Sequence, residues 1–278
     1  MIWERVTKQN PCPICGRPDY CQFGDRAMKC TRVESAHPVQ GVSDVGWYHF
    51  YSSERPDFLP SQQRKHMQSE SIDAPALLAK MRRDTKFEHF GLCAKDLGVS
   101  ARSLTDLGAA WSVKHSAWAF PMLNGLGAPI GIRLRNAEGF KWAIKGSRQG
   151  VFTSIPRIDT RLAYIPEGPT STAALLSLGL FAVGRAAALC GFDMVRETLR
   201  RLSIYRVVIV ADNDEMKKLG QREGRPGIEA AQKLQKELKM PSVIWIPPSP
   251  CKDVRDFVKR GGTRKMIESA VNQKVWKV

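Results

Sequence analysis

In the second half of the chain, short unbroken apolar runs alternate with longer stretches in which the apolar residues have helical spacing. The apolar runs cover 162–166, 207–211 and 242–247. The run 207–211 has no polar alternation, which is typical of a strand buried on both faces of a parallel sheet. Helices are expected over 171–178, 196–202, 227–239, 253–259 and 263–271. This order predicts an α/β fold with a parallel sheet and helices on both of its faces.

Each of the three apolar runs leads into an acidic residue. The first ends at Glu167, the second at Asp212 and Asp214, and the third continues to Asp253. Because the carboxyl ends of parallel strands meet at one edge of a sheet, we expect four carboxylates to gather there and to bind a divalent cation. A structural role is the alternative for each acid: Asp253 could cap a helix that starts at Val254, Asp214 could occupy a turn, and Glu167 could be solvated.

The middle of the chain is basic. After a helical pattern over 75–109, short strands are expected over 117–122, 130–134 and 140–144, separated by Gly and Asn turns. The basic residues on and around these strands are Arg133, Arg135, Lys141, Lys145 and Arg148. Alternate residues such as Arg133 and Arg135 share a face, so the strands predict a cationic surface leading toward Glu167. Phosphate binding is favoured over the alternative of a merely solvated face.

Four of the seven cysteines lie within the first 30 residues, as Cys12-x2-Cys15-x5-Cys21-x8-Cys30 among turn-forming residues. This spacing predicts one tetrahedral zinc site rather than disulfides. A segment of about 45 residues buries too little apolar surface to fold alone, so the metal would supply stability. Free structural thiols are the alternative, and His37 could replace Cys21 or Cys30 as a ligand.

Composition narrows the class of partner. The 278 residues contain 43 Lys and Arg against 27 Asp and Glu, a formal net charge of +16, which favours a nucleic acid as partner. No apolar run is long enough to span a bilayer, and the first residues lack a signal-peptide core. We therefore expect a cytoplasmic protein with no membrane partner.

The motifs together resemble a known family. Glu167-Gly168, Asp212-Asn213-Asp214 and Lys252-Asp253 look like the motifs of the Toprim fold, shared by primases, type IA and II topoisomerases and related nucleases. The segment from Arg135 to Lys141, with Lys145-Gly146-Ser147 and Val151-Phe152 after it, resembles the basic strands of primases of the phage primase–helicase type and, more distantly, of the bacterial DnaG type. Those primases also carry an N-terminal zinc ribbon on a flexible linker. The likeness covers nearly the whole chain in order.

The resemblance implies a domain organisation: a zinc-binding module over 1–51, a linker over 52–74, the basic N-terminal part of a polymerase domain over 75–160, and a Toprim domain over 161–278. It implies magnesium binding by Asp212 and Asp214, proton transfer or metal binding by Glu167, and a further metal-linked role for Asp253. The cations implied to contact triphosphate, template or primer are Lys252, Arg135, Lys141 and Lys145.

The chain also departs from the family pattern. Ser171 stands where the family often has another acid. Arg185 stands where small residues are usual, and we expect it to meet a nucleotide phosphate. The charged, Gly-containing stretch 215–225 looks like an insertion, expected as a loop over the site. No Gly-x4-Gly-Lys-Ser/Thr occurs in the sequence, so it contains no ATP-driven helicase of that type.

The sequence therefore predicts a DNA primase that makes short RNA primers by nucleotidyl transfer, with catalytic Mg²⁺ or Mn²⁺ and one structural Zn²⁺. Its expected partners are a single-stranded DNA template, ribonucleoside triphosphates and a separate replicative helicase or polymerase in a bacterial cell. A phage, plasmid or chromosomal origin stays open, as do the start sequence, the sugar preference and the oligomeric state. The alternatives are a metal-dependent Toprim nuclease and a non-catalytic, DNA-binding replication adaptor.

Overall fold

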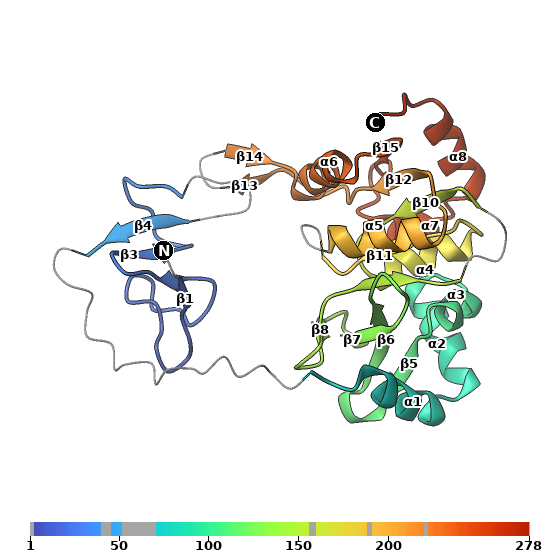
Figure 1. The fold of residues 1–278 in the computed structure, drawn as a ribbon, viewed down its shortest axis with the longest axis horizontal. Helices are drawn as coiled ribbons and strands as arrows, with labels where there is room; N and C mark the ends of the chain where they lie inside the picture. The colour runs from blue at the N-terminus through green and yellow to red at the C-terminus, as the bar shows by residue number, and fades with distance from the viewer. Residues whose placement is uncertain are drawn as a thin grey trace. The chain divides into compact units, whose positions relative to one another are not determined.

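The computed structural model describes residues 3–39, 46–51, 71–155, 160–187, 191–219 and 222–277 (Figure 1). The chain forms two compact units, Met1–Met67 with Met216–Gly224, and Gln68–Glu215 with Arg225–Val278. Most of the predicted linker, residues 52–70, lies outside the described residues. Among the described helices, none combines the length and the apolar content needed to cross a bilayer.

The first unit contains a small antiparallel sheet in the order β1-β2-β3-β4. Its strands are β1 (Glu4–Arg5), β2 (Gln22–Phe23), β3 (Ala27–Cys30) and β4 (Trp47–Phe50). Val6, Phe23 and Met28 pack with the buried cysteines into a core of very few residues. So small a core leaves much of the unit's stability to another source, as expected for a metal-dependent module.

The stretch after Asp214 differs from the expected loop. It contains β13 (Lys217–Leu219) and β14 (Arg222–Gly224), which pair as an antiparallel hairpin. Its predicted location over the acidic site stays a prediction.

The second unit is built on a parallel sheet in the order β10-β12-β15. Its strands are β10 (Leu162–Ile165), β12 (Arg206–Val210) and β15 (Ser242–Trp245). The residues from Val207 to Val210 are all buried, because helices cover both faces of the sheet. This confirms the strand predicted from the absence of polar alternation.

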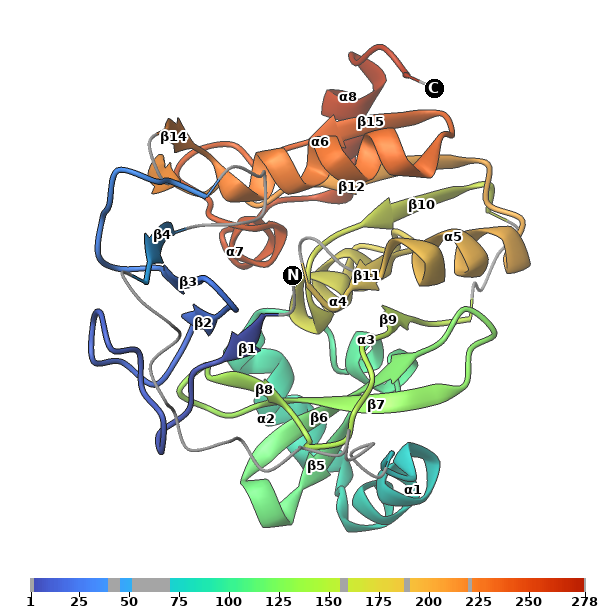
Figure 2. The same cartoon turned by 60° about the vertical axis from the view of Figure 1, so that its left-hand side comes forward.

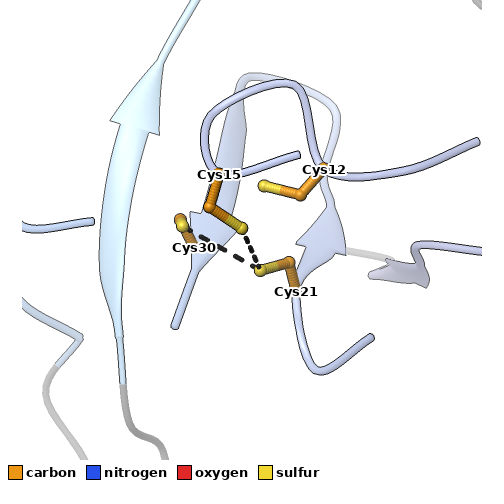
Figure 3. Close-up of side chains that lie close together, drawn as sticks. All are labelled: Cys12, Cys15, Cys21 and Cys30. Carbon is orange, nitrogen blue, oxygen red and sulfur yellow. Dashed lines mark hydrogen bonds between the residues drawn. The ribbon is translucent and has the colours of Figure 1, made fainter. Parts of the chain in front are cut away.

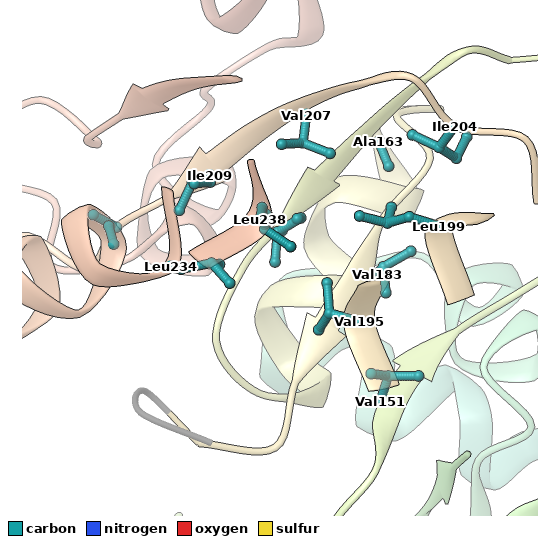
Figure 4. Close-up of a cluster of buried hydrophobic side chains, with 13 residues drawn as sticks. Val151, Ala163, Val183, Val195, Leu199, Ile204, Val207, Ile209, Leu234 and Leu238 are labelled. Carbon is teal, nitrogen blue, oxygen red and sulfur yellow. The ribbon is translucent and has the colours of Figure 1, made fainter. Parts of the chain in front are cut away.

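Two groups of helices enclose this sheet. On one face, α5 (Phe192–Arg201) and α6 (Pro226–Leu238) contribute Val195, Leu199 and Leu234 to a core shared with β12 (Figure 4). On the other face lie α4 (Pro169–Ser177), α7 (Val254–Lys259) and α8 (Arg264–Asn272). Proline in the first turn begins α4 and α6, and the Thr263 side chain caps α8.

A second, largely antiparallel sheet carries the basic strands, in the order β11-β9-β6-β7-β8, with β5 also paired to β6. Its strands are β5 (Ala110–Ser112), β6 (Ala117–Leu123), β7 (Pro129–Arg135), β8 (Lys141–Ala143), β9 (Val151–Thr153) and β11 (Val183–Arg185). Single bridges, Tyr164 to Ala182 and Glu167 to Arg185, connect the β10 segment to the β11 segment. The two sheets are therefore joined side by side (Figure 2).

Three helices and one short 3-10 turn complete this unit: α1 (Ala74–Asp84), α2 (Phe87–Leu97), α3 (Ala101–Asp106) and η1 (Val113–His115). Leu78 of α1 packs with Ile132 and Leu134 on one face of the antiparallel sheet, whereas α2 and α3 pack with Phe120 on the other. The predicted class, a parallel sheet with flanking helices preceded by a mixed α+β basic part and a cysteine module, is confirmed.

Candidate functional site

The two central strands carry their acids to the same edge of the parallel sheet. In the register of the pair, Ile165 of β10 lies opposite Ile209 of β12. Glu167 follows Ile165 by two residues, and Asp212 follows Val210, the last residue of β12, by two. Both acids are half-buried. The parallel register therefore brings together two acids that are 45 positions apart in the sequence.

Backbone hydrogen bonds fix the loop that follows β12. The amide of Ala211 donates to the carbonyl of Trp245 at 3.0 Å, which extends the strand pairing by one residue. The amide of Asn213 donates to the carbonyl of Lys252 at 2.7 Å, and its side-chain Nδ2 donates to the carbonyl of Cys251 at 3.2 Å. The loop of Asp212 and Asp214 is thereby tied to the loop of Lys252 and Asp253.

The start of α6 abuts Asp212. A Cβ atom at Gly227, in the first turn of α6, would lie 2.6 Å from the carbonyl oxygen of Asp212 and 3.1 Å from its Cβ. Only glycine allows this close approach of a helix to the acidic loop. The sequence of Pro226 and Gly227 thus sets the position of Asp212 as well as the start of the helix.

The electrostatics of Asp212 show that the acids act on one another. Burial, and then the negative charges of Glu167, Asp253 and Asp214, raise the pKa of the Asp212 carboxyl to about 7, against an opposing effect of Lys141. Among the described residues, however, only the four cysteines bring three or more possible metal-ligand atoms within 4.8 Å of one another. The acids are neighbours, but their oxygen atoms do not form so tight a group.

Asp253 has a structural contact as well. One of its oxygens accepts a hydrogen bond from the amide of Asp256 at 2.7 Å and so caps α7, as the capping alternative predicted. Its charge nevertheless contributes to the raised pKa of Asp212. A structural contact and an electrostatic effect on the acidic edge therefore coexist in this one side chain.

The basic strands place cations toward these acids. Arg135 of β7 lies directly opposite Lys141 of β8, and Arg133 shares their face, as predicted. Burial and then the charge of Arg255 lower the pKa of Arg135, while Asp253 opposes this shift. The residue Lys141 is exposed, but desolvation of its ammonium group and then the charge of Arg135 lower its pKa, against Asp253 and Asp212. Cations and carboxylates thus act on each other across this region.

Arg255 was not predicted from the sequence. It lies in the first turn of α7, two residues after Asp253, and its charge acts on both Arg135 and Lys141. The signal was present in the sequence, since Arg255 lies two residues after the Lys252-Asp253 motif. A lone arginine on an amphipathic helix has no spacing that distinguishes it from a solvated residue.

The remaining predicted cations either contact other parts of the protein or are exposed to solvent. Arg133 donates from Nη2 to the carbonyl of Ala186 at 3.0 Å, a contact within the protein. Arg185 is only 2% exposed, which does not suit the predicted phosphate contact, because a phosphate would have to enter the core to reach it. Lys145, Arg148 and Lys252 are exposed. Their predicted contacts with nucleic acid or nucleotide stay predictions.

The four cysteines of the first unit form the second candidate site (Figure 3). The distances are 3.7 Å between the Sγ atoms of Cys15 and Cys21 and 3.9 Å between those of Cys21 and Cys30. Four sulfurs around a tetrahedral zinc ion with Zn–S bonds of about 2.3 Å would lie about 3.8 Å apart. These two distances match that geometry, and all four sulfurs lie within 4.8 Å of one another, so the cluster suits a zinc ion.

Donors near the sulfurs support thiolate ligands at this site. The amide of Val33 lies 3.4 Å from Sγ of Cys30, and Nη1 of Arg32 lies 3.9 Å from Sγ of Cys21. His37 is not among the clustered ligands; its ring instead makes an edge contact with Phe50 at 5.0 Å between centroids. The cysteine set predicted from spacing is thus the one the structure assembles, and the histidine alternative is wrong.

A parallel sheet with acids at its carboxyl edge is joined to a basic antiparallel sheet. Solved structures of primases have a similar fold. A DnaG primase catalytic domain bound to single-stranded DNA is similar over 73% of this chain and 78% of that chain, with 12% identity and a TM-score of 0.56. The zinc-binding and RNA polymerase domains of Aquifex aeolicus primase are similar over 73% of this chain and 60% of that chain, with 15% identity and a TM-score of 0.57.

The primase fragment of the bacteriophage T7 primase–helicase aligns over 96% of this chain and 99% of that chain, with 13% identity and a TM-score of 0.48, too low to support a conclusion. No protein-family model matches the sequence, and no curated protein matches it. At these identities the likeness shows a shared fold, that of the DnaG-type primase core.

Proposed function

We propose that this protein is a DNA primase, which makes short RNA primers on a single-stranded DNA template. The observation that carries the proposal is the environment of Asp212. The charges of three other carboxylates raise its pKa, and the charge of Lys141 lowers it. This combination suits a reaction between polyanions, in which nucleotide phosphates must be brought to a cation held by acids. The shared fold with DnaG-type catalytic cores supports the same assignment.

The acidic edge fits a divalent cation. Burial raises the pKa of Asp212 most, and repulsion from the neighbouring acids raises it further; a bound cation would offset both effects. Mg²⁺ typically binds one or two carboxylates and keeps several waters, so acids that are near but not tightly grouped suit it. Asp212 and Asp214, with Glu167, would hold Mg²⁺ or Mn²⁺, and the bound ion would lower the pKa of the attacking 3′ hydroxyl and neutralise the leaving pyrophosphate.

The chain's own residues account for the rest of the chemistry. Arg135, Lys141 and Arg255 would hold phosphates of the template and of the incoming triphosphate, because their cluster of positive charge faces the acids. Glu167, two residues beyond the end of β10, would either help to hold the ion or accept the proton of the attacking hydroxyl. The zinc module would stack exposed rings, such as Tyr20 and Phe50, on unpaired bases near the start sequence. A separate helicase or polymerase is the proposed protein partner.

The proposal is tested by primer synthesis. The zinc-loaded full-length chain is incubated with single-stranded DNA of mixed sequence, labelled ribonucleotides and Mg²⁺, and the products are separated by length. We expect template-dependent RNA oligomers, and Asp212→Asn should reduce their yield about 100-fold or more, the order expected when a charged group is lost from a reaction centre. The matched control is Asp193→Asn, since Asp193 is an exposed acid paired only with Arg196 in the described surface contacts.

Two results would contradict the proposal in different ways. Strand cleavage in Mg²⁺ without nucleotide incorporation would identify a nuclease. Full DNA binding without any turnover, unchanged in Asp212→Asn, would identify a non-catalytic adaptor. If wild type and Asp212→Asn make equal amounts of primer, the protein is a primase, but the acidic edge is not its active site.

A further inference from the structure

An aromatic ring stands exposed beside the basic strands. Phe140 lies in the turn between β7 and β8 and is 70% exposed. Its amide donates to Oδ1 of Asn136 at 2.8 Å, and its carbonyl accepts from the amide of Asn136 at 3.2 Å. Gly139, with φ of +90°, closes the turn by donating to the carbonyl of Asn136 at 3.1 Å. The backbone that carries this ring is thus held by several hydrogen bonds.

The turn is also flanked by positive charge. Lys141 follows Phe140 directly, and Arg135 pairs with Lys141 across the two strands. Nη2 of Arg135 lies 3.6 Å from the position that a Cβ of Gly139 would occupy, so the guanidinium lies against the turn. The exposed ring is therefore carried by a turn that has two cations beside it.

Sites for single-stranded nucleic acids combine these two elements, because cations follow the phosphates and rings stack on unpaired bases. We propose that Phe140 stacks on an unpaired base of the DNA template while Arg135 and Lys141 hold adjacent phosphates. The identity of the strand as template rests on the proposed function. Because Lys141 and Asp212 shift each other's pKa, the stacked base would lie on the side of the basic strands that faces the acidic edge.

The test measures DNA binding without chemistry. A fluorescently labelled 16-nucleotide oligo-dT is titrated with the zinc-loaded full-length protein, without Mg²⁺ or nucleotides, and anisotropy is followed at several NaCl concentrations. Stacking contributes about 1–3 kcal/mol per base, so Phe140→Ala should weaken binding about 5-fold or more, and Phe140→Tyr should retain it. Because a ring neutralises no phosphate, the slope of log affinity against log salt should not change in Phe140→Ala. In Lys141→Ala the slope should become shallower by about 0.7.

Two controls separate stacking from general damage. Leu126→Ala removes an equally exposed apolar side chain, 70% exposed, from the turn between β6 and β7, and should bind DNA as wild type does. An abasic oligonucleotide of the same length offers phosphates but no bases, and wild type and Phe140→Ala should bind it equally.

The proposal is overturned if Phe140→Ala binds oligo-dT with the affinity of wild type. It is also overturned if Phe140→Ala binds the abasic strand more weakly than wild type does, or if Leu126→Ala loses as much affinity for oligo-dT as Phe140→Ala. Failure of wild type to bind oligo-dT also overturns it. Because no step of this test requires synthesis, its outcome is independent of the primer assay. If wild type makes primers but Phe140→Ala binds DNA as wild type does, the protein is a primase and the stacking contact is rejected.

Discussion

The buried charge of Asp212 should destabilise the metal-free protein, and Asp212→Asn should therefore stabilise it. The pKa of this carboxyl is raised from the ordinary value of 3.8 to about 7, first by burial and then by Glu167. A difference of about three pKa units corresponds to about 4 kcal/mol at about 1.4 kcal/mol per unit. Because Asp212 is only half-buried and coupled acids share protons, solvent screening reduces the expected gain to about 1–3 kcal/mol.

The pH dependence has a definite sign. Between pH 3.8 and about 7 the folded protein holds a proton on Asp212 that the unfolded chain has released. The free energy of unfolding of wild type therefore falls as pH rises through this window and levels off above pH 7. Asp212→Asn lacks this titrating group, so its free energy of unfolding should not fall in this window. The difference in unfolding free energy between variant and wild type should be largest at pH 8, and at pH 4.5 it should be about a quarter of that value.

Calorimetric unfolding in Mg²⁺-free buffer that retains zinc measures the difference in the second unit. A gain of 1–3 kcal/mol corresponds to about 3–9 °C in melting temperature for a unit of this size. Added Mg²⁺ should raise the melting temperature of wild type and narrow the gap, whereas exposed Asp193→Asn should match wild type at every pH. A gap that is absent at pH 8, or equal at pH 4.5 and pH 8, would refute the reasoning.

Three further predictions concern single contacts. Cys21→Ser should lose the single equivalent of bound zinc measured by atomic emission, whereas Cys93→Ser, at a buried thiol outside the cluster, should keep it. Gly227→Ala places a Cβ 2.6 Å from the carbonyl oxygen of Asp212. We therefore expect a loss of about 1–3 kcal/mol in unfolding free energy and weaker stabilisation by Mg²⁺. Unchanged values of both would show that α6 can shift to accept the methyl group. Asp253→Asn keeps a capping oxygen, so it should match wild type in stability but lose primer synthesis. Asp253→Ala should lose primer synthesis and also about 1 kcal/mol of unfolding free energy. Equal primer synthesis in Asp253→Asn and wild type would show that Asp253 only caps the helix.

The sequence predicted the sheet and its acidic edge because both follow from short-range rules. An apolar run without polar alternation, such as Val207–Val210, has to be covered on both faces. Parallel strands then place residues such as Glu167 and Asp212 at one edge whatever lies between them in sequence. The cysteine spacing was equally informative, since four thiols within 19 residues of a small unit indicate a shared metal ion.

The contacts that depend on tertiary packing were not predictable in this way. Val183–Arg185 is too short for a periodicity, and its pairing with β9 is a long-range choice that leaves Arg185 buried. Arg255 acquires its place only through the packing of α7 against the sheet. The close approach of Gly227 to Asp212 likewise has no local signal, because a glycine after a proline is equally consistent with an ordinary helix start.

Asp253 connects the acidic edge to the cations that oppose it. One of its oxygens caps α7 through the amide of Asp256, which orients the first turn of that helix and therefore the backbone of Arg255. The same carboxylate raises the pKa of Asp212, which disfavours the charged form of that acid, and it also raises the pKa of Arg135 and Lys141, which favours the charged form of these bases. Loss of this side chain in Asp253→Ala would therefore alter both the charge and the helix start, whereas Asp253→Asn would alter the charge alone. The acidic and basic groups are thus coupled through the start of one short helix, so the capping contact of Asp253 is compatible with the role in the chemistry that we propose for it.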